Sequence, residues 1–252
     1  DVRVALFAEG IVACDQGGRV KIVGVIACLG FLAGCGGQEE EANTPRKRAE
    51  AEISQVLRAL EVNPDAPLLH FQLGQTYQKH GYVDSARTAF ERCVELYESF
   101  AEAHLQLAQI YYEEGDLERS VRAYEQTVRF DAGNAAAYNN LGFVYKKLDR
   151  PEEAVKAYER AIAADSLFAQ AYNNLGQLFK NREEHEQAIA LFRRAIAIKP
   201  DFPEVYINLA GVYEGRDVDE ETSVWQTFLA KFGEDQQYSV HARERLALLK
   251  TP

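Results

Sequence analysis

From residue 67 onward, large apolar side chains recur with a period of 34 residues. The most regular position is a leucine, which occurs as Leu73, Leu107, Leu141, Leu175 and Leu209. In the first unit this leucine is accompanied by His70 three residues earlier, Gly74 one residue later and Tyr77 four residues later. These offsets place the four side chains on one face of a helix. The pattern predicts an amphipathic helix at the start of every unit.

A second helix is predicted in the other half of each unit. Ala86, Phe90 and Cys93 are spaced by four and three residues, and similar small and aromatic residues recur in the later units. The fifth unit is expected to be one residue shorter, because Trp225 rather than Gln226 supplies its aromatic position. Each unit is therefore a helix–turn–helix that buries its apolar face only against its neighbours.

These positions resemble the signature of the tetratricopeptide repeat family. The period is that of the family, and Pro64 and Pro200 occupy its proline position. The resemblance implies an all-α fold, a right-handed α-solenoid of helix-turn-helix repeats in which the first helices line the concave side. The five predicted units are residues 67–100, 101–134, 135–168, 169–202 and 203–236.

The turns of the repeat array fit this pattern, whereas its ends deviate from it. Gly81 and Gly115 suit the left-handed residue that ends a helix. Asp149 and Glu183 replace glycine in two units, so the same turn is less clearly predicted there. Pro151 suits the first turn of a helix.

A capping helix is predicted at each end of the array. Residues 47–66 fit a lone second helix that shields the first unit. Residues 237–252 fit an amphipathic C-terminal capping helix, in which Val240, Leu246 and Leu249 are spaced for one face.

The N-terminal segment resembles the signal of a bacterial lipoprotein. Residues 22–33 are a continuous apolar run that is shorter than the roughly 20 residues of a membrane-spanning helix. Arg19 and Lys21 come before it, and Leu-Ala-Gly-Cys at 32–35 resembles a lipobox. The resemblance implies a signal peptide over residues 1–34 that is removed before Cys35, which then carries lipid.

The residues around this signal allow more than one interpretation. The chain contains no methionine. Initiation at Val20 would leave residues 1–19 untranslated, and the alternative is an extended basic region before the apolar run. Residues 35–46 would be the lipidated cysteine and a flexible polar tether. If there is no signal, the apolar run is a buried helix with an incidental cysteine.

Charge and composition exclude several functions. Lys and Arg total 28 against 39 Asp and Glu, a formal net charge of −11. An acidic chain lacks the basic footprint that binding to nucleic acid needs, so no nucleic acid partner is expected. For the same reason, attachment to a membrane would depend on lipid rather than on a polybasic patch.

No catalytic residue, metal site or cofactor is predicted. The sequence has no histidine pair or cysteine cluster at metal-ligand spacing and no phosphate-binding glycine loop. His70 and His104 occupy packing positions of the repeat, and Cys93 takes an alanine-like site as an inert thiol. We therefore expect a protein that is not an enzyme.

Candidate binding residues lie on the first helices, on the face that the repeat turns toward the groove. Side-chain amides can bind the backbone of an extended peptide, aromatic rings can anchor apolar side chains, and the lysines can meet an acidic group. The predicted groove residues are Phe71, Gln75, Gln78, Leu105, Gln109, Tyr112, Asn139, Asn140, Phe143, Lys146, Asn173, Asn174, Gln177, Lys180 and Asn208.

The asparagines admit a second interpretation, in which they only support packing between units. A similar asparagine ladder occurs in the repeats of O-GlcNAc transferases, but no transferase domain follows here. The two-carboxylate clamp of chaperone-binding members is disfavoured, because Phe71 and Gln75 replace the lysine and asparagine that it needs in the first unit.

Together these features predict a non-catalytic lipoprotein scaffold of the bacterial cell envelope that binds envelope proteins or extended peptides. Related roles are pilus and secretin assembly, outer-membrane protein assembly and peptidoglycan-related complexes. Gly36 is not the aspartate that retains lipoproteins at the inner membrane, which favours the outer membrane, facing the periplasm. The alternative is a solenoid that binds a small molecule or a lipid.

Overall fold

The computed structural model describes residues 4–7, 10–14, 20–22, 44–233 and 236–249. They belong to two units, residues 1–47 and residues 48–252, which are considered separately. The predicted signal cleavage site, Cys35 and the tether up to residue 43 lie outside the described residues.

The N-terminal unit, residues 1–47, contains a small antiparallel sheet that the sequence pattern does not predict. Its strands are β1 (Val4–Phe7), β2 (Gly10–Cys14) and β3 (Val20–Ile22), in the order β1-β2-β3. Leu6 is opposite Ile11, and Ala13 is opposite Lys21. The strands are rich in valine and isoleucine, which favour β structure. This sheet falls in the region that the sequence assigns to a signal peptide and its upstream extension.

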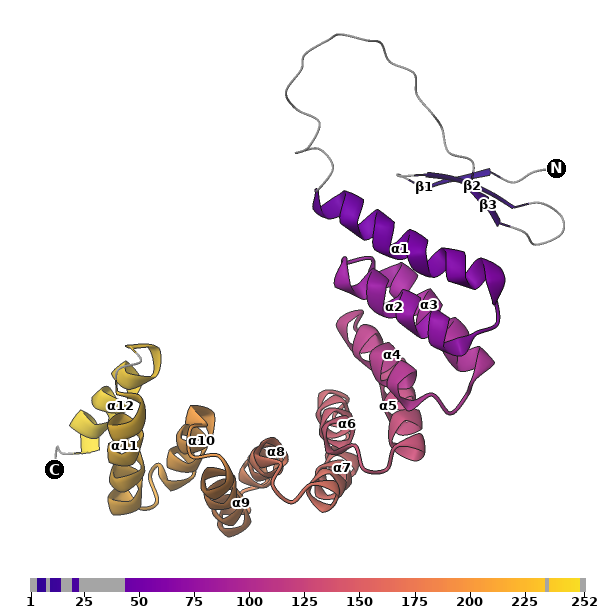
Figure 1. Ribbon diagram of the computed structural model, residues 1–252. Helices are drawn as coiled ribbons and strands as arrows, with labels where there is room; N and C mark the ends of the chain where they lie inside the picture. Colours follow the sequence, from indigo (N-terminus) through magenta and orange to yellow (C-terminus); the bar gives the residue numbers. More distant parts are fainter. Residues whose placement is uncertain (1–3, 8–9, 15–19, 23–43, 234–235, 250–252) are drawn as a thin grey trace, which may run out of the picture. The chain divides into compact units, whose positions relative to one another are not determined.

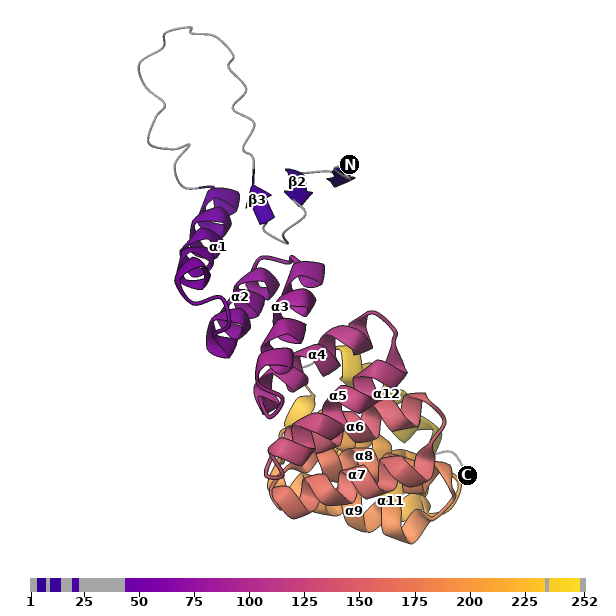
Figure 2. The same cartoon turned by 90° about the vertical axis from the view of Figure 1, so that its right-hand side faces the viewer.

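The C-terminal unit, residues 48–252, is an all-α solenoid, as predicted (Figure 1). Its first helix is α1 (Pro45–Val62), whose first three residues precede the boundary between the units. Five helix pairs follow, and the last helix is α12 (Gln236–Leu249). The pairs follow one another in chain order (Figures 1 and 2). They are α2 (Pro67–Lys79) with α3 (Val83–Leu96), α4 (Ala101–Glu113) with α5 (Leu117–Phe130), α6 (Ala135–Lys147) with α7 (Pro151–Ala164), α8 (Ala169–Asn181) with α9 (His185–Ile198), and α10 (Pro203–Tyr213) with α11 (Val218–Phe232).

Local sequence explains where many of these helices begin. Proline stands in the first turn of α2, α7 and α10, where its missing N–H costs no hydrogen bond. Asp116, Asn134 and Asp217 cap α5, α6 and α11, and each side chain accepts a hydrogen bond from a backbone N–H in the first turn.

Within a pair, the two helices approach closely where glycine faces an aromatic ring. A Cβ at Gly74 would lie 2.5 Å from the Phe90 ring, and one at Gly142 would lie 2.8 Å from the Tyr158 ring. Phe90 and Tyr158 are fully buried. The small residues therefore admit the rings of the second helices, as the repeat pattern predicts.

The turn between paired helices is the same whether or not it contains glycine. Gly81 and Gly115 have φ of 78° and 80°, and Asp149 and Glu183 have φ of 56° and 61°. After Glu183, the N–H of Glu184 donates to the Phe179 carbonyl at 2.9 Å. The turn is thus kept at a cost of about 1–2 kcal/mol for each non-glycine residue.

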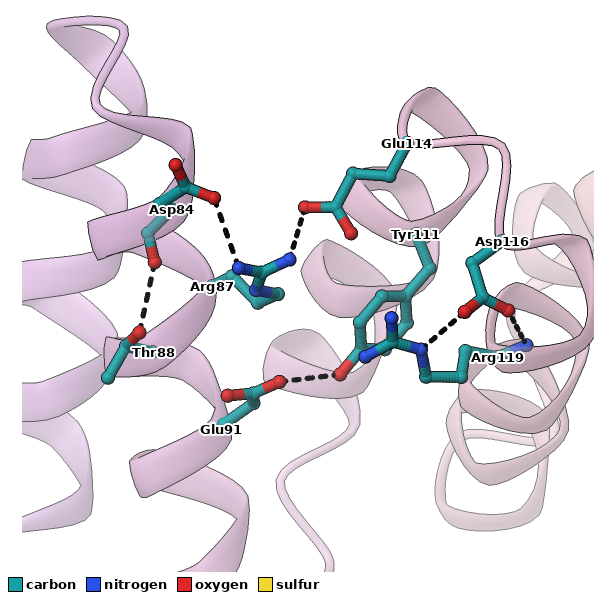
Figure 3. A network of polar contacts seen from close by, with 8 residues as sticks. All are labelled: Asp84, Arg87, Thr88, Glu91, Tyr111, Glu114, Asp116 and Arg119. Atoms are coloured by element: carbon teal, nitrogen blue, oxygen red, sulfur yellow. Dashed lines mark hydrogen bonds and ion pairs between the residues drawn. The ribbon is translucent and has the colours of Figure 1, made fainter.

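Polar contacts join the first unit of the array to the second (Figure 3). The Tyr111 hydroxyl donates to Glu91 at 2.8 Å, and Arg87 pairs with Glu114 at 2.6 Å. Within the second unit, the Arg119 guanidinium lies 4.7 Å from the Tyr111 ring centre. The next junction repeats the tyrosine–glutamate bond, since the Tyr145 hydroxyl donates to Glu125 at 2.6 Å.

Both ends of the array are covered by a helix. Val56 and Leu60 of α1 pack with Leu73 of α2. At the other end, Ala242 of α12 joins the core cluster that contains Trp225.

The register of the fifth unit agrees with its predicted deletion, and one detail of α12 does not agree with the sequence pattern. Trp225 is 3% exposed, while Gln226 is exposed. Val240 was expected on the packed face of α12 but is 51% exposed, because the packed positions fall on Ser239 and Ala242.

Candidate functional site

The first helices of the pairs lie on the inner side of the curve of the solenoid (Figure 1). There α6 contacts α8, and α8 contacts α10. The inner side is formed by α2, α4, α6, α8 and α10, which carry all the predicted groove residues. We call this surface the concave face.

The asparagines of the concave face are hydrogen-bonded across unit boundaries. Asn174 donates to Asn139 at 2.8 Å, and Asn208 donates to Asn173 at 2.9 Å. Asn139 and Asn173 are buried. Asn140 accepts a longer bond of 3.4 Å from Asn139. These amides hold neighbouring units together, so only their remaining hydrogen-bonding groups are available to a ligand.

A second row of contacts joins the last turn of one first helix to the middle of the next. The rings of Tyr112 and Phe143 meet edge to face, with their centres 5.8 Å apart. Lys146 Nζ donates to Gln177 Oε1 at 3.3 Å. The sequence pattern does not predict these pairs, whose members lie 31 residues apart.

Lys180 continues this row at the last boundary. Its Nζ occupies the space that a Cβ at Gly211 would take. Glycine at this position therefore makes room for the lysine side chain on the concave face.

The character of the concave face changes along its length. Toward the N-terminal end, Phe71 is half-buried between Phe90 and Phe100, and Leu105 is also half-buried. Gln75 is exposed, as is Gln78, and Gln109 is half-buried. Toward the C-terminal end, amides and lysines replace the apolar side chains.

The two lysines of the concave face differ from several arginines of the solenoid. Among the described residues, neither Lys146 nor Lys180 forms an ion pair, whereas Arg87, Arg92 and others do. Burial lowers the pKa of Lys180, although the charge of Glu214 acts in the opposite direction. A half-buried ammonium without a partner favours an anionic group nearby.

A cavity of about 350 Å³, which we call the C-terminal pocket, lies at the end of this face. Lys180, Ile207 and Gly211 line it from α8 and α10, and Trp225 and Leu248 line it from α11 and α12. It is thus lined by four helices rather than by the first helices alone.

Glu221, which also lines the pocket, stands where the other units have a small residue. It is one helical turn before Trp225, as Ala188 is before Phe192, and it is 1% exposed. Arg245 of α12 compensates its charge, with Nε 2.6 Å and Nη2 3.3 Å from the carboxylate. The repeat pattern does not single out this residue, although the predicted deletion places Glu221 at the small position.

The residues first considered for chemistry have packing roles. Cys93 is fully buried, and burial raises its pKa to about 11, so its thiolate form is disfavoured. His104 bonds the Glu98 carbonyl at 2.7 Å, and His70 bonds the Pro64 carbonyl at 2.7 Å. No group of three or more potential metal ligands occurs in the described part of the chain. Within the same residues, no helix is both long and apolar enough to cross a bilayer.

Comparison with known proteins agrees with this architecture. Family models of the tetratricopeptide repeat match residues 67–110, 108–149 and 133–201. No curated protein sequence matches the chain.

Solved structures with the same fold include those of MamA, YrrB and PilF. A crystal structure of MamA is 27% identical with a TM-score of 0.62, and the match covers 68% of this chain and 94% of MamA. YrrB, titled a tetratricopeptide protein with an unusual peptide-binding site, is 18% identical with a TM-score of 0.63 and coverages of 75% and 97%. PilF of Pseudomonas aeruginosa is 23% identical with a TM-score of 0.57 and coverages of 73% and 91%. The helix-pair geometry and the matched residues 67–201 together place this chain in the tetratricopeptide repeat family.

Proposed function

We propose that this protein is a non-catalytic scaffold that binds extended segments of partner proteins on its concave face. The observation that carries the proposal is the row of half-exposed aromatic, amide and lysine side chains along the first helices. Tyr112 and Phe143 offer apolar contact, Gln109 offers an amide, and Lys146 and Lys180 form no ion pair among the described residues. YrrB, with the same fold, is titled as having a peptide-binding site.

The proposal extends to the bacterial cell envelope, where a lipid on Cys35 would anchor the scaffold at the outer membrane, facing the periplasm. The apolar run before Cys35 and the lipobox-like sequence support this location. A Cys35→Ser variant is expected to lose lipid and to leave the membrane fraction. Recovery of that variant as a processed, membrane-bound protein would contradict the anchor.

Site-specific photo-crosslinking in the source organism tests the binding surface. A photoreactive residue replaces Gln75 or Gln109 on the concave face, or Gln187 on α9 as the control position outside it. The same few envelope proteins are expected to crosslink from both concave positions and not from Gln187. Crosslinks from Gln187 alone would move the binding surface to the second helices.

A solenoid that binds a small molecule or a lipid is the second candidate. Its support is the C-terminal pocket, whose volume lies in the range of ligand sites. The charged lining by Glu214, Glu221 and Arg245 disfavours a lipid chain there. Mass spectrometry of the protein purified from its source would reveal a retained small ligand.

A further inference from the structure

The C-terminal pocket has features that the rest of the concave face lacks. It is bounded on one side by the first helices, through Lys180 and Ile207, and on the other by His241 and Leu248 of α12. A peptide that follows the first helices toward the C-terminal end therefore meets α12 there. Such a pocket suits the end of a chain better than a segment that continues past it.

The charges of the pocket are distributed unevenly. Arg245 is committed to acidic partners, since it contacts the buried carboxylate of Glu221 and also lies 3.2 Å from Glu214. Lys180 comes from the opposite side, and within the described residues its Nζ has no hydrogen bond or ion pair. Lys180 is thus the cation that remains available to a ligand.

The alternative, a cationic ligand, fits these contacts poorly. Glu221 also accepts a hydrogen bond from Trp225 Nε1 at 3.4 Å, so its carboxylate is already occupied. A positively charged group would have to displace Arg245 from a carboxylate that is 1% exposed. An anionic group approaching Lys180 from the concave face would displace no hydrogen bond or ion pair of the described residues, and it would share the lysine's charge with Glu214.

The walls next to Lys180 are suited to the last side chain of a peptide. Ile207, Ala210 and Leu248 provide apolar surface, and the Trp225 ring adds an aromatic face. Gly211 has no side chain, and the Lys180 ammonium takes the space that one would fill.

We propose that the C-terminal pocket binds the free C-terminal carboxylate of an extended peptide through Lys180, with the terminal side chain against Ile207 and Leu248. This inference rests on the proposed function of the concave face and makes it more specific. It assigns a direction to the bound segment, whose C-terminus lies against α12.

Two pools of random synthetic peptides test the assignment, one with free C-terminal carboxylates and one with C-terminal amides. Both are passed over the immobilised full-length protein, and retained peptides are identified by mass spectrometry. Retention of the free-carboxylate pool is expected to exceed that of the amide pool by about tenfold, as for a charge-assisted hydrogen bond.

Variants separate the role of the pocket from general loss of structure. Lys180→Gln and Gly211→Leu are expected to abolish the preference for a free carboxylate while circular dichroism stays unchanged. Lys156→Gln, which removes an exposed lysine of α7, is the charge-matched control and should retain the preference.

The outcomes distinguish this inference from the proposed function. If peptides are retained without preference for a free carboxylate, or if the preference survives in Lys180→Gln, the pocket assignment is wrong and binding by the concave face stands. An equal preference for internal aspartate or glutamate in amidated peptides also contradicts a terminal carboxylate. If the wild-type protein retains neither pool, both proposals are contradicted.

Discussion

At the scale of single residues, equivalent side chains in successive units make different contacts, and the effect of these differences on stability can be measured. The aromatic position of the second helix is Phe90, Tyr124, Tyr158 and Phe192 in successive units. Burial raises the pKa of Tyr124, and the side chain of Asn140, which lies near its hydroxyl, acts in the opposite direction. The hydroxyl of Tyr158 is buried and has no hydrogen-bond partner in the structure. Equivalent side chains therefore contribute differently to stability.

Replacing each tyrosine by phenylalanine should reveal this difference. Tyr158→Phe removes a buried polar atom that bonds nothing, so we expect stability to be unchanged or raised by about 1 kcal/mol. Tyr124→Phe loses the polar interaction between its hydroxyl and Asn140 and should cost about 1 kcal/mol. Urea unfolding followed by circular dichroism measures both. Equal losses in the two variants would mean that the Tyr158 hydroxyl does have a partner.

His104 makes the free energy of unfolding depend on pH. Burial lowers the pKa of His104 below its ordinary value of 6.5. The unfolded chain then binds the proton at a higher pH than the folded protein does, so stability falls as the pH drops below 6.5 and levels off below the folded pKa.

The substitution His104→Tyr introduces the residue that the later units have at this position. It should remove this pH dependence of the stability. The urea midpoint of the wild type is expected to fall more between pH 7.5 and pH 5.5 than that of the variant. Parallel pH profiles would show that His104 does not contribute.

At the scale of elements, the helix pairs follow from local pattern, and the C-terminal cap does not. Spacing within one unit predicts both helices and the glycine–ring contact, because each depends on residues that are near in sequence. The junction of α11 with α12 depends on Glu221 and Arg245, which are 24 residues apart. Glu221 departs from the small residue of the other units, and Arg245 lies outside the repeats. The prediction that Val240 packs against the array is wrong for the same reason, because the packed face of α12 is determined by its contact with α11.

Three variants test how the cap is attached. Arg245→Met leaves the carboxylate of Glu221 buried without its partner and should cost about 3–5 kcal/mol. The double variant Glu221→Ala with Arg245→Met restores the small residue of the other units and should recover most of that loss. Glu221→Ala alone completes the double-mutant cycle, measured by urea unfolding. Additive losses in the cycle would contradict a direct coupling between the two side chains.

At the scale of the whole molecule, function depends on surfaces that only the stacked units create. The sequence places fifteen candidate residues on the face formed by the first helices, because their positions within each unit are known. It does not predict that Asn139 and Asn173 are used in hydrogen bonds between units, nor that Tyr112 meets Phe143. The sheet β1–β3 was also missed, since the pairing of short strands is not determined by helical periodicity.

The central claim is that partners bind the concave face, and the affinity of a crosslinked partner for two matched triple variants tests it most directly. The first variant is Lys146→Gln, Gln177→Ala and Lys180→Gln on the concave face. The second is Lys156→Gln, Arg160→Gln and Gln187→Ala at exposed positions of α7 and α9. The first should bind at least about tenfold more weakly than the wild type, and the second should bind equally well. Loss of affinity in the second variant alone would contradict the account.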